Sequence, residues 1–479
     1  MVTGKAEPHR SVLLSIAIAS ILCGTDAVAA VDLQSEVTAG IAYTDNVTLA
    51  STAEESEVVY QLLPSFTLAQ RATRMTSSVA YQMSAYRYDS GGENEVHNQF
   101  DGRTTIELDP ENFLFDLGAS RGQSIRDASL AIPRGTLPIS ANRVDRNEAY
   151  AGPSFRYPLG RSVTAAGSYQ RSWVRYDDEP DATNFSTRDA DSETVTFSFD
   201  NYRRERGMTW AVRYSSLETD YHVFVPWRYK QAVAELGAWV AQGLRIFVSG
   251  GKESAWDEPF DPSLEDTLWD AGLTKAAGER WVIELAAGER SFGNSRRGRV
   301  QFTFRRGSMS VVYNEEPTTQ ERNPYLRGGL FNPLEPDDFL ADPGTPERFI
   351  LKRLQWSAAF ELSRTQLSFY FFDETREQRV LLDGTSLQDS EQSGVGISAS
   401  RDLGARTNLR LGAGRSRRQF QPDVDGELTD ASIAATYNFS PRSRLSLEYR
   451  YVEDKFDDNA VSDDGYDAST VSLLFTRIF

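Results

Sequence analysis

Short runs of alternating apolar and polar side chains fill the chain after its first thirty residues. One run places apolar residues at Leu354, Trp356, Ala358 and Phe360, and the last run places them at Val471, Leu473 and Phe475. A period of two is typical of a β-strand with one apolar face. The pattern predicts about twenty-two segments of roughly 8 to 14 residues each.

The connections between these segments alternate in length. Short ones, such as residues 109–112 and 440–443, are separated by long polar ones, such as residues 122–146 and 316–347. A β-sandwich also has alternating strands, but it has no reason to sort its loops in this way. Transmembrane barrels have short turns on one side and long loops on the other. We therefore predict an all-β fold, a transmembrane antiparallel up-and-down β-barrel of about 22 strands (range 18–22), formed by residues 31–479 as one domain.

The first thirty residues have the features of a secretory signal peptide. Lys5 and Arg10 precede the apolar stretch of residues 12–22, and Ala27 to Ala29 offer small residues for cleavage. We expect residues 1–30 to be cleaved. Cys23, the only cysteine, follows the bulky Leu22, which disfavours lipoprotein processing.

The final run resembles the signal that the barrel assembly machinery of the outer membrane reads. Leu473, Phe475 and Phe479 form that signal in our interpretation, whereas Arg477 departs from the usual pattern. An arginine at the rim of the membrane can extend its head into water. Together the two ends of the chain predict the bacterial outer membrane as its location, with outer-membrane lipid, lipopolysaccharide and the barrel assembly machinery as partners.

Aromatic positions and charge agree with a membrane barrel. Aromatic side chains at strand ends share the apolar parity and predict girdles at the membrane interfaces: Tyr43, Phe113, Tyr157, Trp173, Trp210, Trp281, Trp356 and Tyr451. The formal net charge of −18 disfavours nucleic acid as a partner, because phosphate binding needs clustered cations.

The sequence does not favour enzymatic chemistry. Only His97 and His222 remain after the signal peptide, and they lack a metal-binding spacing. Motifs for a serine nucleophile, a phosphate-binding loop or a zinc site are missing from the sequence, and no carboxylate pair is singled out for glycoside cleavage. We expect no catalytic residue, cofactor or metal.

Charged residues on the polar parity are the candidates for the barrel interior. We expect the following to line the pore: Asp101, Arg103, Glu107, Asp116, Arg213, Glu284, Arg299, Arg353, Glu361, Arg410, Glu448 and Arg450. Two interpretations remain open and compatible. Opposite charges on adjacent strands stiffen a hydrated wall, or they form a track for a hydrophilic polymer or sugar.

Two stretches resemble a known family. Residues 43–47 (YTDNV) and 437–451 are similar to the first strand and the last hairpin of an outer-membrane β-barrel porin family found in Gram-negative exopolysaccharide and exosortase (PEP-CTERM) loci. The resemblance implies a role in surface polysaccharide export, with export components as partners. It implies no catalytic residues.

The sequence thus predicts an outer-membrane pore, with exopolysaccharide or a similar hydrophilic polymer as cargo. A general diffusion porin for small solutes and a non-transporting structural or assembly barrel are the alternatives. The loop of residues 316–347 carries apolar side chains that need cover, so we expect it to constrict the mouth, assisted by residues 122–146. Alternatively, both loops pack outside on each other.

Overall fold

The computed structural model describes residues 30–90, 94–125, 132–134, 137–140, 142–177, 189–202, 206–221, 226–255, 265–278, 280–319, 348–380, 389–421, 424–456 and 465–479. The predicted signal peptide falls almost wholly outside these residues and stays a prediction. The first strand already includes Ala30, the last residue of the predicted signal peptide.

The described chain forms 22 strands in one sheet. In chain order they are β1 (Ala30–Thr44), β2 (Glu57–Ala72), β3 (Met75–Tyr88), β4 (Glu95–Asp109), β5 (Phe113–Ile125), β6 (Arg143–Leu159), β7 (Val163–Asp177), β8 (Ala190–Asp200), β9 (Gly207–Tyr221), β10 (Trp227–Ala241), β11 (Leu244–Ala255), β12 (Glu265–Ala277), β13 (Trp281–Arg290), β14 (Gly293–Phe304), β15 (Gly307–Thr319), β16 (Arg348–Glu361), β17 (Thr365–Val380), β18 (Ser390–Asp402), β19 (Thr407–Gln421), β20 (Val424–Ser440), β21 (Ser443–Phe456) and β22 (Tyr466–Ile478).

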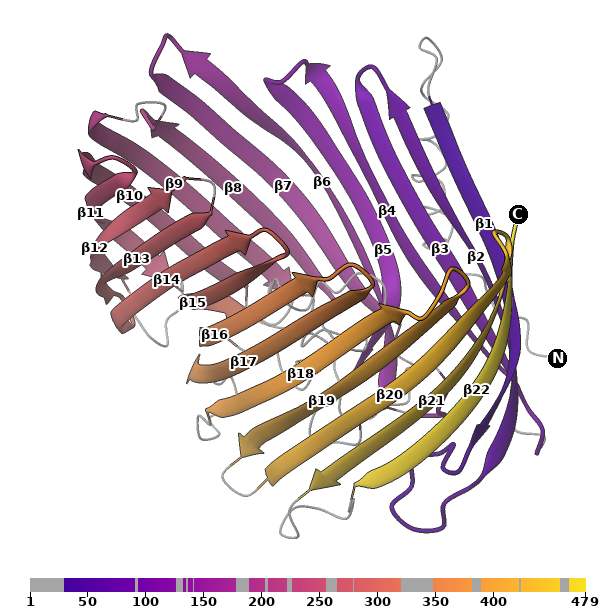
Figure 1. The fold of residues 1–479 in the computed structure, drawn as a ribbon. Coiled ribbons are helices and arrows are strands. Elements are labelled where there is room, and N and C mark those ends of the chain that lie inside the picture. Colours follow the sequence, from indigo (N-terminus) through magenta and orange to yellow (C-terminus); the bar gives the residue numbers. More distant parts are fainter. Residues whose placement is uncertain are drawn as a thin grey trace, which may run out of the picture.

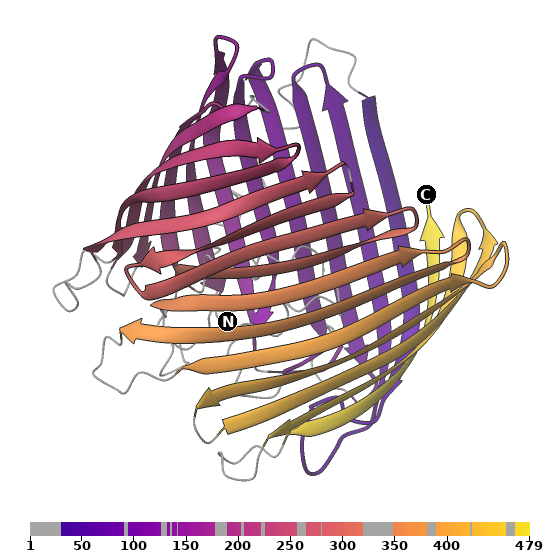
Figure 2. The same cartoon turned by 60° about the vertical axis from the view of Figure 1, so that its left-hand side comes forward.

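Each strand pairs antiparallel with its neighbour in sequence, and β22 pairs with β1 to close the cylinder (Figure 1). In Figure 2 the middle strands of the chain, pink to orange, cross in front of the first strands. A closed sheet leaves no unpaired edge, which is the condition for strands to span a membrane. The predicted fold class is confirmed.

The two ends of the cylinder differ in their connections. At one end, called the turn end here, strand pairs such as β2–β3 and β20–β21 are joined by two-residue connections. The opposite end, the loop end, carries most of the long connections. Two of its connections break the predicted alternation, because residues 291–292 and 422–423 are as short as turns. Several strands are longer than the predicted 8 to 14 residues, since β17, for example, has 16 residues and continues to Val380.

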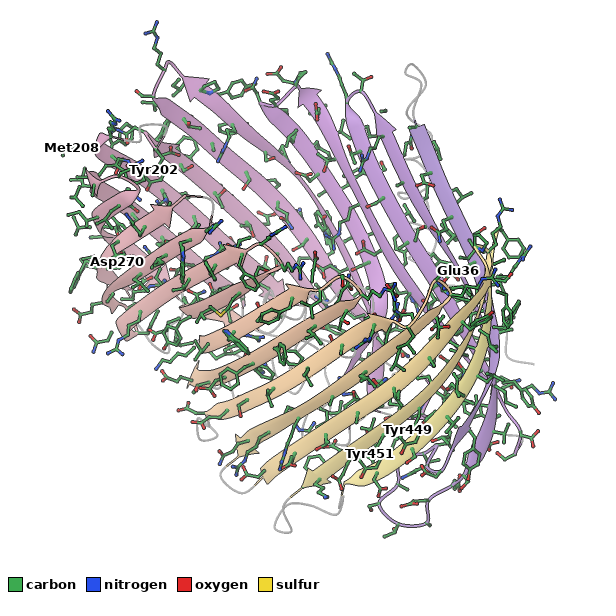
Figure 3. All side chains as sticks on the ribbon, viewed as in Figure 1. Glu36, Tyr202, Met208, Asp270, Tyr449 and Tyr451 are labelled. Atoms are coloured by element: carbon green, nitrogen blue, oxygen red, sulfur yellow. The ribbon has the colours of Figure 1, made fainter. Side chains whose placement is uncertain are left out.

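One parity of each strand forms the outer face, and it is apolar. Leu473 and Phe475 on β22 are 44% and 45% exposed, and Tyr449 and Tyr451 on β21 share this parity in the register (Figure 3). The eight aromatic residues that we assigned to girdles all lie on this face by the strand register. Successive ring contacts run from β13 to β17 through Trp281, Phe302, Phe304, Phe360 and Phe369.

The seam between β1 and β22 is tightly built. Thr38 and Thr476 share a hydrogen bond of 2.8 Å, and Arg444 donates to Glu36 at 3.1 Å. A Cβ atom on Gly40 would lie 2.6 Å from the carbonyl oxygen of Leu473, so this position requires glycine.

Candidate functional site: the barrel lumen

Part of the connection between β5 and β6, the described residues 132–134 and 137–140, reaches across the inside of the barrel to β21 and β22. It is called the crossing segment here. The N–H of Ile132 donates to Asp454 on β21 (3.0 Å), and the hydroxyl of Tyr466 on β22 donates to the Ile132 carbonyl (2.6 Å). Further along, Tyr88 on β3 donates to the carbonyl of Leu137 (3.0 Å). The residues that hold this segment therefore mark the inner face of the barrel.

The crossing segment packs as a small core on one side of the lumen. Leu137 and Ile139 lie against Val47, Val59 and Tyr88, all three buried. The N–H of Ile139 also donates to the carbonyl of Val47 (2.9 Å). A cavity of about 160 Å³ remains beneath it, lined by residues that include Gln61, Arg134, Glu448 and Arg450. The predicted assistance of residues 122–146 in constricting the mouth stays a prediction, because residues 320–347 lie outside the described residues.

Large charged side chains fill the same half of the barrel. Glu374 on β17 accepts from Arg353 (2.9 Å) and from Arg376 (2.8 Å), and all three side chains are at most 2% exposed. Arg418 and Asp454, both fully buried, form a second pair. Phe372 lies under Arg353 in a cation–π contact (5.2 Å). A buried charge is tolerated when an opposite charge and hydrogen bonds compensate it, so these ion pairs hold neighbouring strands of the wall together.

Among the described residues, the opposite half of the lumen is hollow. One cavity of about 540 Å³ lies toward the turn end against β5 to β10, and a second of about 540 Å³ lies toward the loop end against β8 to β15. Arg213, Ser215 and Gln231 line both, so the two cavities adjoin. Small hydroxyl and amide groups recur on the inward face here, among them Ser154, Ser168, Thr196, Ser198, Ser249, Ser295 and Asn314. We call this continuous hollow the lane.

A polar cluster borders the lane at the turn end. Glu235 on β10 accepts from Arg213 (3.0 Å), from Arg245 and from the hydroxyl of Tyr202 (2.6 Å). Tyr202 lies in the connection between β8 and β9, and burial raises the pKa of its hydroxyl above the usual value, so it stays protonated as a donor. Figure 3 shows Tyr202 and Asp270 on the side of the barrel away from Glu36.

The strand register places all twelve sequence-predicted lining residues on the inward parity. Few of these twelve residues contact one another. Asp101 lies beside Arg103 (3.4 Å), Glu284 stands opposite Arg299, and Glu448 and Arg450 line the small cavity. Asp116 instead accepts from Thr105 (2.6 Å). Glu107, Glu361 and Arg410 lie at separate points of the wall.

Most of the residues that form ion pairs with the predicted lining residues were not predicted from the sequence. Arg353 meets Glu374, Arg213 meets Glu235, and Arg450 meets Asp430 (2.8 Å) on the neighbouring strand. The hydroxyl groups of the lane were missed as well, because only charged residues were chosen as candidates. Recurrence of serine and threonine at the inward parity of β6 to β9 is the signal that would have found them.

The remaining candidates are placed as follows. Leu473, Phe475 and Phe479 face outward, and Arg477 donates to Ser443 (2.6 Å) at the turn end. His97 contacts Glu95 and Gln123, whereas His222 lies outside the described residues. The predicted constriction by residues 316–347 cannot be placed, since residues 320–347 lie outside them too.

Among the described residues, no group of three or more histidine, cysteine, aspartate or glutamate side chains is arranged to hold a metal ion. In the same part of the chain, no helix reaches the length and apolarity of a membrane-spanning helix.

A closed barrel of even strand number, apolar outside and polar inside, is the architecture of a bacterial outer-membrane protein. The expected class and the expected location are thereby confirmed.

Comparison with known proteins adds similarity of shape only. No family model matches the chain, and no curated protein matches it. Solved outer-membrane barrels are similar at low identity. The FrpB iron transporter from Neisseria meningitidis is 9% identical over 96% of this chain and 84% of its own (TM-score 0.43). The siderophore receptor PirA from Acinetobacter baumannii is 9% identical over 92% and 80% (TM-score 0.48), and OprD from Pseudomonas aeruginosa is 7% identical over 94% and 95% (TM-score 0.34).

Proposed function

We propose that this barrel is a passive pore through which a hydrophilic polymer, in the first place a polysaccharide, crosses the outer membrane. The observation that carries the proposal is the lane, in which two adjoining cavities reach from the connection after β4 to the loop end of β15. Serine, threonine, asparagine and glutamine offer hydrogen bonds without fixed charge, which suits a hydrated cargo that has to keep moving.

A general diffusion porin for small solutes is the second candidate. The crossing segment fills part of the lumen, and each cavity has the size of a small-molecule site, about 300–1,000 Å³. A structural barrel without transport is the third. The resemblance to porins of exopolysaccharide loci favours polymer over small solutes, with polysaccharide export components as partners.

Current through single proteins in planar lipid bilayers tests the proposal. We expect an open conductance, and we expect Ser215→Trp to lower it because Ser215 lies where the two cavities meet. Ser432→Trp is the control, since Ser432 faces inward on β20 and lines neither cavity. A protein without conductance would favour the structural barrel. Liposome swelling with glucans of increasing length then separates polymer from small-solute passage.

The partner predictions belong to the same proposal. We propose that Leu473, Phe475 and Phe479 on the closing strand are read by the barrel assembly machinery, and that the loop-end exterior lies in lipopolysaccharide. Folding into vesicles with and without purified assembly machinery tests the first point. Phe475→Ser is expected to slow the assisted reaction, whereas Phe439→Ser, on another outward position, is the matched control.

A further inference from the structure

Part of the lane is lined by small polar side chains. Ser249 on β11 and Ser295 on β14 share the inward parity and border the loop-end cavity.

Three polar side chains stand in this hollow. Arg297 on β14 lies 3.2 Å from the carboxylate of Asp270 on β12, and Ser249 is directly opposite Asp270 in the register. Ser249 is only 4% exposed. In the described part of the chain, neither the Ser249 hydroxyl nor the Nε of Arg297 has a hydrogen-bond partner. Buried polar groups are nearly always satisfied, so this capacity points to a group that binds here.

The geometry matches neighbouring hydroxyl groups of a sugar. A carboxylate accepts a hydrogen bond from a hydroxyl, and a guanidinium donates to one. Asp270 and Arg297 therefore present an acceptor and a donor side by side, and Ser249 can do both.

The charge of the lane indicates an uncharged ligand. Its lining holds four arginines (Arg156, Arg213, Arg290, Arg297) and four carboxylates (Glu111, Asp270, Glu315, Glu316), so the formal charges cancel. Glu253 also accepts from Arg290 (2.7 Å), which ties that cation to the wall. A track for a polyanion needs an excess of cations, and a track for metal cations needs an excess of carboxylates.

We infer that Ser249, Asp270 and Arg297 form a glycosyl subsite for an uncharged glycan. The inference rests on the proposed passage of a polysaccharide and narrows its cargo to a neutral chain. The subsite lies in the loop-end cavity, so a chain held there continues past Ser215 into the second cavity.

Titration calorimetry of the full chain in detergent tests the subsite, with maltohexaose as the neutral probe and hexagalacturonate as the anionic one. We expect maltohexaose to bind more tightly than hexagalacturonate. Asp270→Ala should weaken maltohexaose binding about three- to tenfold, the effect of losing one hydrogen bond. Asp101→Ala is the control, because Asp101 also pairs with an inward arginine but lines neither cavity.

Three outcomes would overturn the subsite: no binding of either glycan, tighter binding of hexagalacturonate, or equal effects of the two variants. The first would mean that the hollow holds water only. Conductance is measured on the same preparation, so the two proposals fail separately. Conductance without maltohexaose binding would support the pore and overturn the subsite. Maltohexaose binding without conductance would support the subsite and overturn the pore.

Discussion

Asp454 and Ile132 lie 322 positions apart in sequence and are joined by a hydrogen bond of 3.0 Å from the Ile132 N–H to the Asp454 carboxylate. The same carboxylate accepts from Arg418, which is fully buried. One side chain on β21 therefore holds both the segment that crosses the lumen and a cation of the wall.

Replacing this carboxylate should release the crossing segment and destabilise the wall. Asp454→Asn leaves Arg418 buried without a counter-charge, which costs about 3–5 kcal/mol in the free energy of unfolding. Arg134 belongs to the crossing segment and is only 4% exposed, which shields it from trypsin. Release of the segment should therefore make cleavage after Arg134 faster. Denaturant-driven unfolding in lipid vesicles and timed proteolysis measure the two effects.

Two further variants distinguish the loss of a hydrogen bond to the crossing segment from the loss of the buried counter-charge. Tyr466→Phe removes the bond to the Ile132 carbonyl and leaves Asp454 and Arg418 paired, so proteolysis should accelerate while stability falls by only about 1–3 kcal/mol. Asp425→Asn is the control, because its partner Arg417 is 70% exposed. Unchanged cleavage in both Asp454→Asn and Tyr466→Phe would show that these residues do not hold the segment.

The buried triad of the wall predicts a second stability difference. Glu374→Gln leaves Arg353 and Arg376 with a neutral partner in a buried position and should cost about 3–5 kcal/mol. Glu427→Gln removes the partner of Arg415, which is 65% exposed, and should lower stability far less. Comparable losses in the two variants, measured by unfolding in vesicles, would contradict the buried placement of Glu374.

The two faces of β20 can be tested at adjacent positions. Ile433 faces outward and is 43% exposed, whereas Ser432 faces the lumen. Ile433→Arg should destabilise the barrel by about 2–4 kcal/mol in lipid, because a cation near the middle of the apolar belt loses its water. Ser432→Arg should have a much smaller effect. Equal destabilisation would refute the assignment of faces.

Closure of the cylinder depends on a glycine at the seam. Gly40→Ala places a Cβ atom against the backbone of β22 and should cost about 1–3 kcal/mol by overpacking, with slower formation of the folded band in unheated electrophoresis. Gly404→Ala is the control, since open space surrounds that position. If Gly40→Ala folded as readily as Gly404→Ala, the seam would be looser than the structure indicates.

The alternation of side chains determined most of the fold. Leu445, Leu447 and Tyr449 alternate with polar residues, and only an extended strand between apolar and wet surroundings fits that pattern. Strand number and the outward face followed from it. The two short loop-end connections at residues 291–292 and 422–423 did not, because turn chemistry that joins two strands tightly is compatible with either end.

The lumen was decided by the tertiary structure. The sequence assigned Arg353 and Glu361 to the interior by their parity, but it did not reveal that Arg353 meets Glu374. Such partners depend on the register between neighbouring strands and on the curvature of the closed sheet, which no local pattern encodes. Parity along one strand is a local property, whereas which half of the barrel is filled and which is hollow depends on contacts such as Ile132 with Asp454, between residues hundreds of positions apart.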